Sequence, residues 1–204
     1  AINVAYLAAS VCFIVGLKML SSVKTAKTGN LVGSVGMLLA IVATLLDRRV
    51  VDWPPVIAGL AAGSLLGTIL ALKVRMTGMP QMVGLLNGFG GAASALVASA
   101  ELMRAVNSGA APDRGSTAAI AASIFIGWIT FTGSAMAFAK LQGLVTSRPI
   151  VLPLQKTLNA ELALACVALS AWLALRPDAA PAFWFLSALS LALGVTLVNP
   201  IGGA

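Results

Sequence analysis

The chain has 204 residues, of which 59% are hydrophobic and only 9% are charged, and 13 basic residues against six acidic ones give a formal net charge of +7. Its mean hydropathy of +0.99 excludes an ordinary water-soluble globular protein. The sequence contains no His, which is the usual proton carrier at neutral pH, the commonest transition-metal ligand and the base of Ser and Cys catalytic triads. We therefore expect an integral membrane protein that holds no metal and performs no catalysis by itself.

Seven apolar runs divide the chain, and a helix needs about 20 residues to cross the ~30 Å hydrocarbon layer of a membrane. A transmembrane β-barrel is disfavoured because the runs do not alternate apolar and polar residues. We predict an all-α fold, a polytopic transmembrane helical bundle of about seven spanning helices in one domain over residues 1–204. The predicted spans are residues 2–20, 31–46, 56–74, 81–103, 118–141, 158–175 and 182–198.

The basic residues fall mainly on one side of this predicted bundle. One side receives eight of them with no acid in its loops, whereas the other receives five basic and five acidic residues. Because Lys and Arg in short loops stay in the cytoplasm, we place the N-terminus outside and the C-terminus in the cytoplasm. The net charge then reflects topology rather than binding to nucleic acid. The eight residues are Lys18, Lys24, Lys27, Lys73, Arg75, Lys140, Arg148 and Lys156.

Small residues recur at helical spacing in three of the predicted spans. In the third span, Gly59, Gly63 and Gly67 form two successive G-x-x-x-G steps, which let helix backbones approach closely. The other two stripes are Gly84, Asn87, Gly91 and Ser94 in the fourth span, and Ser123, Gly127, Thr130, Ser134 and Ala137 in the fifth. Two interpretations stay open, helix packing or the lining of a narrow polar path for protons or ions, and spacing alone favours packing.

Glu161 is the one carboxylate that does not fall in a predicted loop. An ionisable group at membrane depth is a candidate proton carrier. However, Glu161 lies in the first turn of the predicted sixth span, where an acid complements the helix dipole. Its position favours a structural role over proton carriage, and both interpretations stay open.

Four stretches in order carry a more specific signal. They are MTGMPQMVGLLNGFGG at residues 76–91, FTGSAMAFAKLQG at 131–143, RPIVLPLQK at 148–156 and NPIGGA at 199–204. Together they resemble the membrane part of the beta subunit of proton-translocating NAD(P) transhydrogenase, over nearly the whole chain. In that family the subunit has nine spans and then a soluble NADP(H)-binding domain. The resemblance implies that this sequence is a fragment that continues into two more spans and that domain.

The resemblance also implies a function and a set of partners. The family couples hydride transfer from NADH to NADP⁺ to inward proton movement across the bacterial inner membrane. The nucleotides NAD(H) and NADP(H) bind to soluble domains, so this fragment is expected to bind no cofactor and to supply the proton path. Expected partners are an alpha-type membrane subunit, the soluble domains and a second copy of the whole enzyme, within a lipid bilayer.

Individual residues match the family's pattern. Asn87 falls where some members place a proton-carrying His, and members with Asn there carry the His on the alpha-type membrane subunit instead. Ser134 matches a polar channel serine, and Gly91, Gly127 and Gly133 match close-packing glycines. With Thr130, Asn87 and Ser134 are thus the expected proton-path residues.

The role of Asn87 has two interpretations. Its amide cannot titrate, but it both donates and accepts hydrogen bonds, so it is suited to hold a water or a partner's His in a desolvated path. Alternatively, it only bonds a neighbouring helix, as amides in membranes readily do. The alternative class for the whole chain is a non-enzymatic transporter or a structural membrane subunit.

Overall fold

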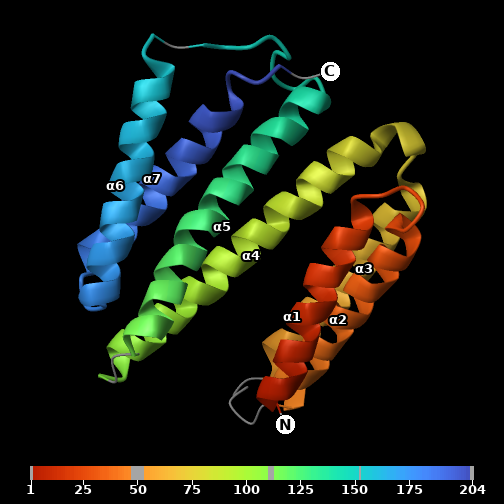
Figure 1. Ribbon diagram of the computed structural model, residues 1–204, viewed down its shortest axis with the longest axis horizontal. Helices are drawn as coiled ribbons and strands as arrows, with labels where there is room; N and C mark the ends of the chain where they lie inside the picture. Colours follow the sequence, from red (N-terminus) through yellow and green to blue (C-terminus); the bar gives the residue numbers. More distant parts are fainter. Residues whose placement is uncertain (1, 47–52, 110–112, 152, 203–204) are drawn as a thin grey trace. The chain divides into compact units, whose positions relative to one another are not determined.

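The computed structural model describes residues 2–46, 53–109, 113–151 and 153–202. Its regular structure in these residues is helical throughout. The chain divides into two compact units, Ala1–Leu72 and Lys73–Ala204, and each is described by itself (Figure 1). The predicted single domain over residues 1–204 stays a prediction.

The first unit contains α1 (Ile2–Leu20), α2 (Ala26–Leu46) and all but the last residue of α3 (Trp53–Lys73). Helices α1 and α2 form a tightly packed antiparallel pair (Figure 1). The described residues of α3 do not pack against either helix, and none of them is buried. The packed part of this unit is therefore a helical hairpin.

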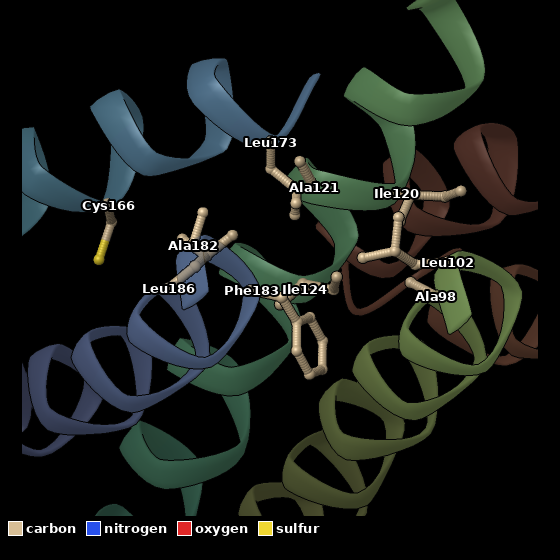
Figure 2. Close-up of a cluster of buried hydrophobic side chains, with 10 residues drawn as sticks. All are labelled: Ala98, Leu102, Ile120, Ala121, Ile124, Cys166, Leu173, Ala182, Phe183 and Leu186. Atoms are coloured by element: carbon tan, nitrogen blue, oxygen red, sulfur yellow. The ribbon is translucent and has the colours of Figure 1, made fainter. Parts of the chain in front are cut away.

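The second unit contains η1 (Met76–Gly78), α4 (Met79–Asn107), α5 (Arg114–Leu141), α6 (Gln155–Leu175) and α7 (Ala180–Val198). Helix α5 lies at its centre, since it packs against α4, α6 and α7. Helices α5 and α7 run in the same direction, and α4 runs antiparallel to α5 (Figure 1). Buried side chains of all four long helices meet in one apolar cluster (Figure 2). Its members are Ala98, Leu102, Ile120, Ala121, Ile124, Cys166, Leu173, Ala182, Phe183 and Leu186.

The prediction of seven spans is confirmed for the described residues, where seven helices are long and apolar enough to cross a membrane. Several bounds were wrong. Helix α2 begins at Ala26 rather than at residue 31, and α4 continues to Asn107 rather than ending at residue 103. Hydropathy marks only the part of a helix suited to hydrocarbon, whereas backbone hydrogen bonds continue through polar residues such as Lys27 and Arg104.

Helix α5 begins earlier than hydropathy predicts because Asp113 caps it. The Asp113 carboxylate accepts hydrogen bonds from the backbone N–H groups of Gly115, at 2.9 Å, and Ser116, at 3.1 Å. It also accepts a hydrogen bond from the Ser116 hydroxyl. These bonds favour the ionised form, so the pKa of Asp113 lies below its usual value, with the Ser116 hydroxyl as the largest cause.

Candidate functional site

The seam between α4 and α5 is closed by glycines that face each other. A Cβ atom added to Gly91 would lie 2.7 Å from the carbonyl oxygen of Gly127, and one added to Gly127 would lie 2.7 Å from that of Gly91. A Cβ on Gly88 would lie 3.2 Å from the Ser134 Cβ, and one on Gly84 would make ordinary contacts only. The two backbones therefore touch at Gly91 and Gly127, where no larger residue fits.

Asn87 and Ser134 form a hydrogen bond across this seam. The Asn87 Nδ2 donates to the Ser134 Oγ at a distance of 2.8 Å. Gly91, one turn after Asn87, and Gly127, two turns before Ser134, hold the backbones close enough for two short side chains to meet. The two residues singled out by sequence thus lie together as a pair.

The pair leaves hydrogen-bonding capacity unused. No described residue accepts a hydrogen bond from the Ser134 hydroxyl or donates one to the Asn87 Oδ1. The Asn87 side chain is exposed on the surface of the chain, and Ser134 is half-buried. The pair therefore presents one free donor and one free acceptor to whatever lies against α4 and α5.

A groove continues from the pair along the same face of the two helices. Thr130 lies one turn before Ser134 and lines a groove of about 380 Å³ with Gly91, Ser94, Ser123 and other residues. Its hydroxyl donates to the carbonyl of Ile126 in the preceding turn, at 2.7 Å, so its oxygen can still accept a hydrogen bond. A second groove of about 470 Å³ shares Ser94 and Ser123 and extends to Glu101. The grooves are open, with small and hydroxyl-bearing walls.

The other end of the seam lies at Gln81, in the first turn of α4. Its Nε2 donates to the carbonyl of Leu141, the last residue of α5, at 3.3 Å. Its Oε1 is buried and accepts no hydrogen bond from the described part of the chain. The first turn of α4 therefore carries one amide and no carboxylate.

Gly133 does not face α4. A Cβ atom on it would lie 3.4 Å from the Gly194 carbonyl oxygen and 3.4 Å from the Val198 Cγ2, so it packs against α7. On the same face, the Thr132 hydroxyl donates to the Leu191 carbonyl at 2.8 Å. Gly194 leaves no room for a Cβ beside Thr132. The sequence patterns did not single out Gly194, although it is the only glycine in α7.

The first unit contains a close helix seam that the sequence patterns also did not single out. A Cβ atom on Gly29 would lie 2.8 Å from the Gly16 carbonyl oxygen, and one on Gly36 would lie 2.9 Å from the Cys12 Cβ. Gly29 begins a G-x-x-x-G step with Gly33, which was a usable signal. In contrast, Cβ atoms on the α3 glycines, Gly59, Gly63 and Gly67, would meet nothing within 4 Å among the described residues. Their packing role stays a prediction.

Glu161 lies deeper in its helix than predicted. Helix α6 begins at Gln155 and has no acid in its first turn, so Glu161 falls in the second turn. The argument from the helix dipole was therefore misplaced, because that effect falls off within the first turn. The side chain is exposed and has no ion pair or hydrogen bond with the described residues. Its role as a possible ionisable group stays a prediction.

These features are those of a polytopic α-helical membrane protein. It carries a polar pair in a helix seam that is closed by glycines. The sequence model described as "NAD(P) transhydrogenase beta subunit" matches residues 2–204. NAD(P) transhydrogenase subunit beta of Rhodospirillum rubrum is 39% identical over 204 residues, covering 98% of this chain and 44% of that protein. The same figures hold for the subunit of the strain ATCC 11170 of that organism.

The chain therefore belongs to the NAD(P) transhydrogenase beta subunit family. The family resemblance stated from four motifs is confirmed. The chain spans less than half the length of these curated relatives. 

Proposed function

We propose that this chain forms the proton-conducting membrane part of an NAD(P) transhydrogenase, and that Asn87 and Ser134 line its proton path. In this enzyme, proton translocation is coupled to hydride transfer from NADH to NADP⁺, which takes place on soluble domains. The observation that carries the proposal is the hydrogen bond between Asn87 and Ser134, in a chain that belongs to this family. Neither side chain titrates at neutral pH, so the pair positions a carrier rather than acting as one.

The carrier is a His of the alpha-type membrane subunit. A neutral imidazole donates from one ring nitrogen and accepts at the other, which complements the free Ser134 hydroxyl and the free Asn87 Oδ1. The open groove beside Gly91 and Thr130, lined with small residues, suits a helix of that subunit. The complete enzyme also includes domains that bind NAD(H) and NADP(H), and it assembles as a dimer.

The test replaces each member of the pair in the full-length protein, assembled with its partner subunits in sealed vesicles. Asn87→Leu removes both functions of the amide, and Ser134→Ala removes the hydroxyl. Each lost hydrogen bond in a medium that cannot replace it costs about 1 to 3 kcal/mol, so we expect each variant to slow proton-coupled transhydrogenation about tenfold or more. Hydride exchange on the isolated soluble domains should persist.

Matched controls come from α2. Asn30→Leu and Ser34→Ala remove the same groups from a spanning helix. Within the described part of the chain, the Ser34 hydroxyl bonds only the backbone of its own helix, at the Asn30 carbonyl. Both controls should keep the parental rate. If Asn87→Leu and Ser134→Ala assemble normally and translocate protons at the parental rate, the pair only joins two helices and the path lies elsewhere.

The proposed orientation, with the N-terminus outside and the bacterial inner membrane as the location, has its own test. Gly109 has a backbone φ of +68°, where Cys would be strained, so the outer label belongs on the exposed neighbour Ser108. In intact cells, a membrane-impermeant maleimide should modify Ser108→Cys and should leave Ser147→Cys unmodified until the membrane is opened. The opposite pattern would reverse the orientation.

A further inference from the structure

Lys140, in the last turn of α5, is buried to 3% exposure although it carries an ammonium group. Its Nζ donates to the carbonyl oxygens of Asn199 at 2.6 Å, Ile201 at 2.7 Å and Val198 at 3.3 Å. An ammonium has three protons, so each of them has a carbonyl acceptor. We call Lys140 with these three carbonyl groups the Lys140 clasp.

The acceptors explain why a lysine is stable there. Val198 is the last residue of α7, and the final carbonyls of a helix lack partners within the helix. They also form the negative end of the helix dipole, which favours a cation. Among the described residues no carboxylate pairs with Lys140. The carbonyl groups at and beyond the end of α7 therefore replace the hydration of the ammonium. A neutral side chain would leave the Ile201 carbonyl without this partner, whereas the Val198 and Asn199 carbonyls would keep the N–H groups of Ile201 and Ile150 as donors.

The clasp joins three parts of the second unit. The Asn199 carbonyl also accepts a hydrogen bond from the Ile150 N–H at 3.2 Å, in the segment between α5 and α6. The Ser147 hydroxyl of the same segment donates to the Lys140 carbonyl at 3.3 Å. The end of α5, the segment between α5 and α6, and residues 199–201 are thus held by one set of hydrogen bonds.

Helix α5 connects the clasp to the proton-path pair. Ser134 and Lys140 are six residues apart on one helix, or about 9 Å along its axis. Ser134 faces α4, whereas Lys140 and Gly133 face the chain of α7. A continuous helix transmits a displacement along its axis with little loss, because its backbone hydrogen bonds hold successive turns together. A shift of Ser134 therefore displaces the ammonium and the carbonyls bound to it.

We propose that Lys140 is a positioning residue for proton translocation, which ties residues 199–201 to the helix that carries Ser134. This inference rests on the proposed function. In this proposal protonation of the carrier beside Ser134 shifts α5, and the hydrogen bonds of the clasp pass the shift to the chain that follows α7. The clasp thus carries a change at the proton path to the end of α7.

The structural arm of the test measures hydrogen exchange in the full-length complex. Lys140→Met keeps the length and apolar stem of the side chain but removes all three donors. We expect amide exchange in residues 195–201 and 147–151 to rise about tenfold, with unchanged exchange in α4. Lys140→Arg keeps the charge and donors, and it should restore most of the protection. A matched control is Lys156→Met, which removes an exposed lysine near the same helix ends.

The functional arm uses sealed vesicles with equal amounts of assembled complex. Lys140→Met should lower the number of protons moved for each hydride transferred by about tenfold, whereas Lys140→Arg should stay within about threefold of the parent. A lysine needed only for folding would lower the amount of complex and leave this ratio unchanged in what remains. The ratio therefore separates positioning from structural support.

Each outcome of these experiments either supports or overturns the proposed role of Lys140. A Lys140→Met complex that moves protons with the parental ratio overturns the inference, whether or not exchange rises, and so does unchanged exchange in residues 195–201. Failure of the proposed function has a different signature, because it is read in the parent complex. A parent that moves no protons, or whose flux survives Asn87→Leu and Ser134→Ala, overturns the proposed path whatever the Lys140 variants do.

Discussion

Two helix seams in this chain are closed in the same way, by glycines that face each other. In the first unit, α1 and α2 approach through Gly16 and Gly29, and in the second, α4 and α5 approach through Gly91 and Gly127. In both pairs an added Cβ atom would come within 3.0 Å of a facing carbonyl oxygen. The seams differ in what they bring together. Glycine spacing therefore indicates that two helices approach closely. The polar residues beside the glycines decide whether a ligand or a proton carrier can bind there.

The polar residues of the two seams differ in their free capacity. Between α1 and α2, the Tyr6 hydroxyl bonds the Thr44 Oγ1 at 3.0 Å, and the Thr44 hydroxyl donates to the Ala40 carbonyl. Tyr6 is therefore the donor of that bond, and both hydroxyl protons are used. Between α4 and α5, the proton of Ser134 and the Oδ1 of Asn87 have no partner among the described residues. The Asn87–Ser134 pair therefore offers a free donor and a free acceptor to a carrier, whereas the Tyr6–Thr44 pair has no free hydroxyl proton.

The largest expected effect breaks the second seam. Gly127→Leu places a side chain where even a Cβ would lie 2.7 Å from the Gly91 carbonyl and 2.9 Å from Ala95. Overpacking of this kind costs about 3 kcal/mol or more, because backbone atoms cannot move aside cheaply. The yield of folded full-length protein and its thermal unfolding in detergent should both fall sharply. Gly90→Leu is the control, since no atom of the described residues lies within 4 Å of its Cβ position, and equal losses in both variants would contradict the packing argument.

The next effect concerns the third set of glycines, on α3. No described atom would meet a Cβ on Gly63, so we expect Gly63→Leu to change the thermal stability of the chain by less than about 0.5 kcal/mol. If these glycines pack against a partner subunit, the variant should instead lower the amount of partner that co-purifies. Normal co-purification would mean that this face of α3 meets lipid.

A single lost hydrogen bond tests the first seam. Tyr6→Phe removes the hydroxyl that bonds Thr44 and should destabilise the α1–α2 pair by about 1 kcal/mol, measured by thermal unfolding. Proton-coupled transhydrogenation should stay at the parental rate, because the Tyr6–Thr44 pair has no free hydroxyl proton to offer a carrier. A large loss of proton-coupled transhydrogenation in Tyr6→Phe would contradict the functional difference between the two seams.

The last effect concerns the start of α5. The pKa of Asp113 is lowered in the folded chain by the Ser116 hydroxyl and backbone, so its contribution to stability is present above the unfolded-state pKa and is lost as pH falls through the folded-state pKa. Asp113→Ala should therefore unfold at a lower temperature than the parent at neutral pH. The difference should shrink as the medium is acidified below the usual carboxyl range. A difference that does not depend on pH would show that the ionised carboxylate is not the stabilising form.

The sequence by itself determined the class, the number of spans and the family, because bilayer thickness fixes the length of an apolar run and several motifs in order are specific. It also indicated that Asn87 and Ser134 belong together. It did not determine where the polar ends of the helices lie. The predicted start of α2 was therefore too late, and Glu161 was placed in the wrong turn of α6. Hydropathy carries no information on a backbone that continues into the interface.

Only the tertiary structure decided which small residues face one another. Gly133 matched a close-packing pattern together with Gly127, yet the two lie on different faces of α5, against α7 and α4. From the sequence, Lys140 contributed only a positive charge to the prediction of topology. In the fold it lies at the last carbonyls of α7. The physical reason is that spacing along one helix fixes a face but not its neighbour. The neighbour is chosen by packing and by hydrogen bonds between helices, and those join residues as far apart as Lys140 and Asn199.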